Sequence, residues 1–219
     1  EVEQGHWDQA EKRLQAALKT DAKRAAAWAE LAQVQYSRCN LAAAQKSVEH
    51  ALQIDPENPR GRLVQAHLWA STGRLTEADE AYRGFVRYYN QKQPKDAETL
   101  LIVAEGAAEY ARWNGVAQIF DFAVNTLSPD ILKADPLCWQ GHALAGELFL
   151  EKYNEGDALP ELKKALAINP HAASVHALLA LASLDDLELN AAEKSAKQAL
   201  EVDPGHLLAN LVLARIKLH

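Results

Sequence analysis

The chain has 219 residues, of which 48% are apolar and 24% charged, so it has the composition of a folded domain and not of a disordered tail. Its net charge of -7 argues against a nucleic-acid partner, because nucleic-acid binding requires a clustered basic surface. No apolar stretch is long enough to span a membrane, and no signal-peptide pattern opens the sequence. We therefore expect a soluble chain, cytoplasmic or periplasmic, and the sequence does not choose between the two compartments.

Helical segments follow one another along the chain, and small residues recur in them at a fixed interval. An alanine is followed four residues later by an apolar residue on the same helix face, and these pairs recur at one constant interval in the first and in the last part of the chain. The pairs are Ala10 with Leu14, Ala44 with Val48, Ala78 with Tyr82, Ala158 with Leu162, and Ala192 with Ala196. Prolines that end helical segments repeat the interval, since Pro170 and Pro204 are as far apart as Ala158 and Ala192.

This pattern resembles the tetratricopeptide repeat (TPR) family, whose repeat of about 34 residues has the signature W-x-x-L-G-x-x-Y, then A-x-x-x-F, then P. The clearest copy spans 25–58 and holds the signature positions Trp28, Leu31, Ala32, Ala44, Val48, Ala51 and Pro56. Its alanines let two antiparallel helices approach closely, and its larger side chains fill the groove between them. The resemblance implies an all-α fold: a right-handed α-solenoid of antiparallel helix pairs, which is a TPR-like superhelix.

The predicted organisation is a single TPR array. It comprises a half repeat at 1–24, repeats at 25–58, 59–92, 97–130, 139–172 and 173–206, and a truncated repeat at 207–219. The 97–130 copy is degenerate, with Val116 in place of the expected alanine, and the repeat phase slips by four residues before it and by eight after it. Aromatic residues gather in this middle region, either because longer helices need bulkier filling or because a bend there shapes a pocket.

Three further expectations concern a proline, the last segment of the chain and the two cysteines. Pro160 lies within a predicted helix, and we expect Asp157 to cap that helix so that the proline falls in its first turn, where the missing N–H costs little. The strongly apolar 207–219 segment should have its partner helix beyond residue 219, and the absence of Met even at position 1 agrees with a fragment of a longer chain. Cys39 and Cys138 form no metal or redox motif, so we expect two free thiols, with a long-range disulfide as the alternative.

In the TPR family the first helices of successive repeats line a groove in which ligands bind. Projected onto this sequence, that face offers nine candidate binding residues: Tyr36, Arg60, His67, Glu98, Leu101, Glu105, Glu109, Glu147 and Glu151. Carboxylates dominate from Glu98 to Glu151, and those spaced four residues apart share one side of a helix at a cost of a few tenths of a kcal/mol per pair. A solvated acidic face explains this arrangement, and so does a groove for a basic or mixed basic–apolar peptide.

Two familiar uses of the family fail when they are tested residue by residue. The lysines and asparagines of a carboxylate clamp are replaced here, and so is the asparagine ladder of glycosyltransferase-type superhelices. HExxH, GxSxG, Walker-type and GxGxxG motifs do not occur in the sequence, so we expect no catalytic residues, no metal site and no cofactor. His171 and His176 are five residues apart, which is a poor spacing for a metal pair.

The resulting prediction is a bacterial interaction scaffold that binds a protein or peptide, and neither nucleic acid nor the interior of a membrane. An alternative is the non-catalytic TPR arm of a larger enzyme, such as a peptidase or transferase, that docks its own domain or substrate. A third hypothesis is self-association through the apolar 207–219 helix.

Overall fold

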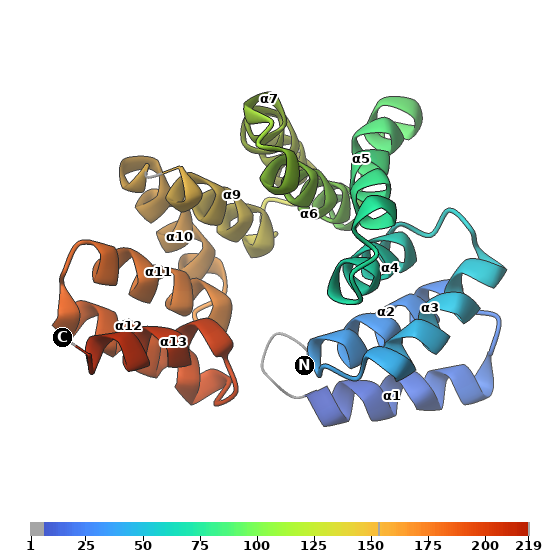
Figure 1. The fold of residues 1–219 in the computed structure, drawn as a ribbon, viewed down its shortest axis with the longest axis horizontal. Helices are drawn as coiled ribbons and strands as arrows, with labels where there is room; N and C mark the ends of the chain where they lie inside the picture. The colour runs from blue at the N-terminus through green and yellow to red at the C-terminus, as the bar shows by residue number, and fades with distance from the viewer. Residues whose placement is uncertain (1–6, 153, 219) are drawn as a thin grey trace. The chain divides into compact units, whose positions relative to one another are not determined.

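The computed structural model describes residues 7–152 and 154–218, and all regular secondary structure in these ranges is helical (Figure 1). The predicted all-α fold of antiparallel helix pairs is thereby confirmed. The chain divides into two compact units, unit 1 up to Asp130 and unit 2 from Ile131. The predicted half repeat 1–24 is described from Trp7 and the truncated repeat 207–219 up to Leu218, and their remaining residues lie outside the described ranges.

Unit 1 begins with five helices that alternate in direction. They are α1 (Trp7–Thr20), α2 (Ala25–Ser37), α3 (Leu41–Ile54), α4 (Pro59–Ser71) and α5 (Leu75–Lys92). Side chains that accept hydrogen bonds from free backbone N–H groups fix two of the helix starts: Asn40 accepts from Ala43 N at 3.3 Å, and Asn58 accepts from Gly61 N at 2.9 Å. Pro59 follows in the first turn of α4, where a missing N–H leaves no helical hydrogen bond unmade.

The third helix pair of unit 1 is longer and less regular than the first two. It consists of α6 (Ala97–Asn114), α7 (Ala117–Phe122), a five-residue π-helical segment η2 (Ala123–Leu127) and α8 (Ser128–Ala134), which crosses the boundary between the units. Helix α5 has 18 residues where α3 has 14, and these four additional residues correspond to the first slip of the repeat phase.

Aromatic side chains fill the contact between α5 and the helices that follow it. Phe85 of α5 lies against Gly106 of α6, where a Cβ atom would be only 2.3 Å from the Phe85 ring. Tyr89 meets Phe122 edge to face, with their ring centroids 5.1 Å apart. Glycine at 106 therefore lets the Phe85 ring of α5 lie directly against the backbone of α6.

Unit 2 holds two helix pairs and a last helix. They are α9 (Trp139–Glu151), α10 (Glu155–Ile168), α11 (Ala173–Asp185), α12 (Leu189–Val202) and α13 (Leu207–Ile216). Gly146 of α9 gives close access to α10, because a Cβ there would lie 2.6 Å from Leu162. Both cysteines are free thiols, with Cys39 exposed and Cys138 buried, so the predicted thiols and not the disulfide are present.

The predicted start of α10 is wrong. Asn154, and not Asp157, caps this helix: its side chain accepts from Asp157 N at 3.3 Å and donates to the Asp157 carboxylate at 2.7 Å. The helix therefore begins at Glu155, and Pro160 lies inside it rather than in the first turn. One i→i−4 hydrogen bond is lost at the proline, because the residue has no N–H to donate.

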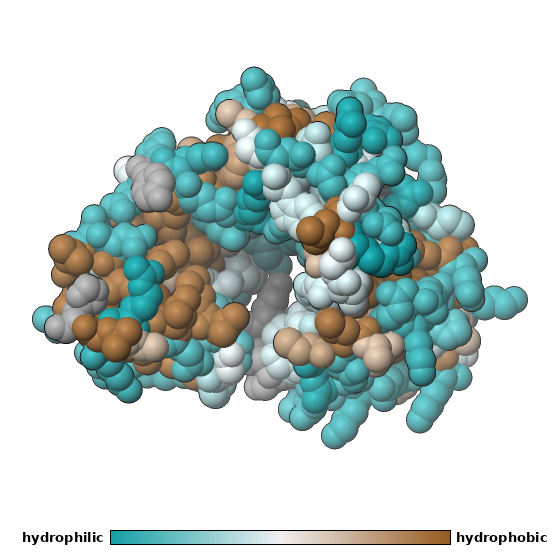
Figure 2. Space-filling model, viewed as in Figure 1, coloured by the Kyte–Doolittle hydropathy of each residue, from teal (hydrophilic) through white to brown (hydrophobic). Residues whose placement is uncertain are grey.

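Apolar side chains gather on the exposed side of α13 at the C-terminal end of unit 2, at the lower left of Figure 2. Leu207 is 83% exposed, Leu211 51% and Leu218 87%, whereas Ala209 and Val212 pack against α11 and α12. In the part of the chain that the structure describes, no helix is both long and apolar enough to cross a membrane.

Candidate functional site

The first helices of the three successive helix pairs in unit 1, α2, α4 and α6, are joined by an ion-pair bridge. Arg60, at the start of α4, donates to the Glu30 carboxylate of α2 at 3.3 Å and to the Glu105 carboxylate of α6 at 3.2 Å. One guanidinium thus holds carboxylates from both neighbouring helices, which its planar fork of five N–H donors allows. Side chains of α2, α4 and α6 are therefore linked to one another on the same side of unit 1.

A row of aromatic rings runs from α2 through α4 and α5 to α6. The Tyr36 ring of α2 stacks on the His67 ring of α4 at 5.4 Å, and the Tyr36 hydroxyl is 3.0 Å from the Ser71 hydroxyl. His67 then contacts Tyr82 at 5.8 Å, and Tyr82 meets Trp113 at 5.5 Å. We call the surface formed by Glu30, Tyr36, Arg60, His67, Ser71, Glu105, Glu109, Arg112 and Trp113 the first-helix face.

Burial controls the protonation of groups at this face. It lowers the pKa of His67 from 6.5 to about 4, with further lowering by the positive charges of Arg60 and Arg112, so His67 is neutral at pH 7. Its Nδ1 atom is enclosed and has no hydrogen-bond partner among the described residues. Burial also raises the pKa of Glu105, although Arg60 opposes this shift, and it raises the pKa of Tyr82, with Glu109 adding to the effect.

Four of the nine predicted residues, Tyr36, Arg60, His67 and Glu105, belong to these contacts. Glu109 also lies on the face and pairs with Arg112 at 2.6 Å. Glu98 is exposed at the start of α6 and has no hydrogen bond or ion pair to any described residue. Two further candidates, Glu147 and Glu151, are on α9 and therefore belong to unit 2.

The prediction for Leu101 needs correction, because this side chain is only 8% exposed and belongs to the core. The eight residues 100–104 and 106–108 of α6 are all buried, since both α4 and α5 pack against this helix. When only one side of a helix packs against a neighbour, the opposite positions face outward. When two sides are packed, as in α6, such positions become enclosed. Leu101 therefore offers little surface to a ligand.

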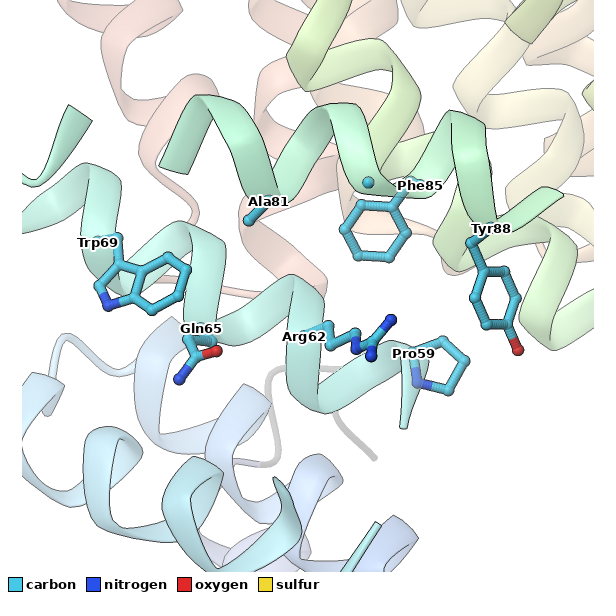
Figure 3. A pocket seen from close by; sticks show the side chains of 8 residues that line it. Pro59, Arg62, Gln65, Trp69, Ala81, Phe85 and Tyr88 are labelled. Atoms are coloured by element: carbon cyan, nitrogen blue, oxygen red, sulfur yellow. The ribbon is translucent and has the colours of Figure 1, made fainter. Parts of the chain in front are cut away.

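The structure contains a pocket that the sequence analysis missed. It has a volume of about 210 Å³ and lies between α4 and α5 (Figure 3). The side chains that define it are Pro59, Arg62, Gln65, Trp69, Phe85 and Tyr88. A signal existed in the sequence, because the TPR positions held by Trp28 and Leu31 in the first full repeat are occupied in the next repeat by Arg62 and Gln65.

A second pocket, of about 470 Å³, lies among α1, α2 and α3, where Trp28 and His50 form part of its lining. It contains none of the nine predicted residues. The described residues also include no group of three or more histidine, cysteine, aspartate or glutamate side chains placed to hold a metal ion.

Known proteins resemble this chain in two ways, by sequence over its first part and by fold over most of its length. The tetratricopeptide repeat family matches the chain over residues 1–68, and no curated protein matches it. Among solved structures, TTC0263, a thermophilic TPR protein of Thermus thermophilus, has a TM-score of 0.69 at 20% identity, covering 89% of this chain and 100% of its own.

Two further structures show the same fold. PilW, a widely conserved type IV pilus biogenesis factor, has a TM-score of 0.56 at 21% identity and covers 94% of this chain and 90% of its own. A chain of the APC/C hetero-tetramer Cut9–Hcn1 has a TM-score of 0.50 at 16% identity, covering 98% of this chain and 47% of its own. The tetratricopeptide repeat family is therefore matched by sequence over residues 1–68, and the helix-pair fold of both units is similar to that of solved TPR proteins.

Proposed function

We propose that this protein is a non-catalytic interaction scaffold that binds a protein or peptide on the first-helix face. The observation that carries the proposal is the row of Tyr36, His67, Tyr82 and Trp113 beside the Arg60 bridge. Aromatic surface next to charged groups suits protein recognition, because interfaces are enriched in tyrosine, tryptophan and arginine. The similar chain in the APC/C hetero-tetramer Cut9–Hcn1 assembles with other chains, which agrees with this use of the fold.

The ligand we propose is a mixed basic–apolar peptide. The first-helix face and the adjacent start of α6 carry four carboxylates, Glu30, Glu98, Glu105 and Glu109, and two guanidinium groups, Arg60 and Arg112. Acidic charge is thus in excess, although the two arginines already neutralise part of it. A peptide with lysine or arginine next to apolar residues would pair with the remaining charge and cover the aromatic row. A non-catalytic arm of a larger enzyme has no observation in its favour.

Fluorescence anisotropy with a labelled eight-residue peptide of alternating lysine and leucine tests this proposal. The matched control peptide alternates glutamate and leucine. We expect the lysine peptide to bind more tightly and its affinity to fall when salt rises from about 50 to about 200 mM, because exposed charges are then screened. Equal binding of the two peptides would contradict the basic–apolar preference.

Charge reversal at Glu98 locates the binding surface without breaking an ion pair. We expect Glu98→Lys to weaken binding of the lysine peptide about threefold to tenfold, since one attraction becomes one repulsion. Glu80→Lys is the matched control, because Glu80 is also exposed but lies on α5, away from the first helices. Equal losses in the two variants would show a general charge effect and would remove the first-helix face from the proposal.

A further inference from the structure

The pocket between α4 and α5 is separate from the first-helix face. Helical periodicity places Arg62, Gln65 and Trp69 on the opposite side of α4 from Arg60 and His67. Figure 3 shows Trp69 at one end of the pocket, with Arg62 and the ring of Phe85 between it and Tyr88 at the other end. A ligand in this pocket therefore would not touch the residues of the proposed peptide-binding face.

Polar groups around this pocket lack partners within the protein. The Arg62 Nε atom donates to the Pro56 carbonyl oxygen at 2.9 Å, and no carboxylate of the described residues forms an ion pair with Arg62. The Gln65 amide, the Trp69 indole N–H and the Tyr88 hydroxyl have no hydrogen bond to another described residue. All four groups can donate a hydrogen bond, and arginine and the indole can only donate. The pocket is therefore suited to a ligand that accepts hydrogen bonds.

Charge around the pocket points the same way. Arg74 lies 5.0 Å above the Trp69 ring and is paired with Glu77 at 2.9 Å, while Lys92 is paired with Glu57 at 2.8 Å. Arg62 lies near enough to help lower the pKa of Glu57, after the larger effect of Lys92. These neighbouring pairs balance each other, so the charge of Arg62 is left in excess and complements an anion.

Equivalent helix pairs have a polar contact at the corresponding position, although Gln35 and Ser47 of the first pair also line part of the 470 Å³ pocket. In α2 and α3, the Ser47 hydroxyl donates to the Gln35 carbonyl oxygen at 2.7 Å. In α9 and α10, a ring nitrogen of His142 is 2.6 Å from the Glu161 carboxylate. The residue that corresponds to Ser47 and Glu161 in α5 is Ala81, which reaches across with a methyl group only. The α4–α5 pair is thus the one of these three in which the polar partner is missing.

We propose that this pocket binds a segment of a partner protein in which an apolar side chain is followed by a carboxylate. The apolar side chain enters between Trp69, Phe85 and Tyr88, and the carboxylate pairs with Arg62 in the place that Glu161 takes beside His142. This is a second docking surface, independent of the first-helix face. A loss of binding at one surface leaves the other unchanged.

Titration with capped tetrapeptides, followed by NMR, tests this assignment. The probe has the sequence Ala-Phe-Glu-Ala, and its controls replace phenylalanine with alanine or glutamate with glutamine. The Trp69 indole N–H signal, assigned with a Trp69→Phe variant, should shift in a saturable way with a Kd on the order of 1 mM. Each control peptide should bind about tenfold more weakly, because it lacks the buried ring or the charge-assisted hydrogen bond.

Three protein variants separate recognition from nonspecific contact. Arg62→Gln should weaken the Ala-Phe-Glu-Ala probe about tenfold, whereas Arg83→Gln, an exposed arginine of α5 outside the pocket, should leave its affinity unchanged. Ala81→Glu should abolish binding, because it supplies Arg62 with an internal carboxylate as Glu161 does for His142. An unaltered helical circular dichroism spectrum and melting temperature in all three variants show that the fold is retained.

Several results would overturn the proposal. They are equal binding of the glutamine peptide, equal loss in Arg62→Gln and Arg83→Gln, or full binding by Ala81→Glu. A Trp69 shift that follows protein concentration without any peptide would instead assign the pocket to a second copy of this chain. The lysine–leucine peptide used for the first-helix face should bind Arg62→Gln normally, so failure of one proposal is distinguishable from failure of the other.

Discussion

The α2–α3 and α4–α5 pairs of unit 1 have equivalent positions along the sequence, yet a side-chain hydrogen bond joins two of these positions in the first pair and not in the second. Gln35 and Ser47 complete each other's hydrogen bonds in the first pair. Trp69 and Ala81 replace them in the second pair and line a pocket of about 210 Å³, whereas Gln35 and Ser47 line part of a pocket of about 470 Å³. The difference teaches that a repeat can change its surface freely while its alanine-lined helix contact, made by Ala44 or Ala78, remains buried.

The prediction with the largest expected effect on stability replaces a core residue of α5 with the residue found at the equivalent position of α3. Phe85 of α5 corresponds to Ala51 of α3, and it is only 4% exposed because it fills the space above Gly106. We expect Phe85→Ala to lower the free energy of unfolding by about 3–5 kcal/mol, since it leaves a cavity. Urea denaturation measures this loss. Adding Gly106→Ala should recover part of it, and a double variant no more stable than Phe85→Ala would contradict the packing described here.

A second prediction replaces a residue of α4 with its equivalent in α2 and concerns how the stability of the protein depends on pH. His67 of α4 corresponds to Gln33 of α2, and its pKa in the folded protein is lowered to about 4 from 6.5. The unfolded chain therefore binds the proton first as pH falls, so stability is complete above pH 6.5 and declines between pH 6.5 and about 4. This decline should reach about 3 kcal/mol and should be absent in His67→Gln. Urea titrations across this range give the comparison, and an identical pH slope in both proteins would contradict it.

A third prediction concerns the hydrogen bond that the Ser47 hydroxyl of α3 donates to the Gln35 side chain of α2. Ser47→Ala should destabilise the protein by about 1–2 kcal/mol, because it leaves the buried Gln35 amide without one of its partners. The reverse change, Ala81→Ser in α5, creates no such dependence and should alter stability by less than about 0.5 kcal/mol. Thermal unfolding of both variants measures the difference. Equal effects would mean that the two positions have the same environment.

The smallest test concerns the turns between the paired helices. Cys39 between α2 and α3 has a φ of 58°, and Gly73, the equivalent residue of the next repeat, has a φ of 80°. The left-handed conformation strains cysteine more than glycine, so Cys39→Gly should stabilise the protein by about 0.5–1 kcal/mol and Gly73→Ala should destabilise it by about 1 kcal/mol. Chemical denaturation measures both changes. A loss of stability in Cys39→Gly would show that the cysteine side chain makes a contact worth more than the strain.

The sequence predicts those features that depend on spacing along one or two helices. The recurrence of Ala10, Ala44 and Ala78 predicts helix pairs, and asparagine before proline predicts the start of α4 at Pro59. The same local reasoning fails at α10, because Asn154 and Asp157 are both suitable caps and only their hydrogen bonds distinguish them. The limits of the repeats within the array stay a prediction.

The candidate site depends on contacts between helices, and it was predicted less completely. The first-helix positions of Tyr36, Arg60, His67 and Glu105 follow from the TPR resemblance. Their contacts do not, since Arg60 meets residues 30 positions before it and 45 positions after it. Leu101 was predicted at the groove because the TPR resemblance places it on the groove side of a first helix, while packing on both sides of α6 buries it.

The sequence by itself determined the all-α class and the pairing of helices, because alanine spacing and proline positions act over one helical hairpin. Only the tertiary structure decided which side chains meet between the hairpins. Side chains from three helices must be in place before Arg60 can bridge Glu30 and Glu105. The α4–α5 pocket arises in the same way, because an unpaired Arg62 becomes apparent only when Ala81 on the facing helix is seen to leave the space open.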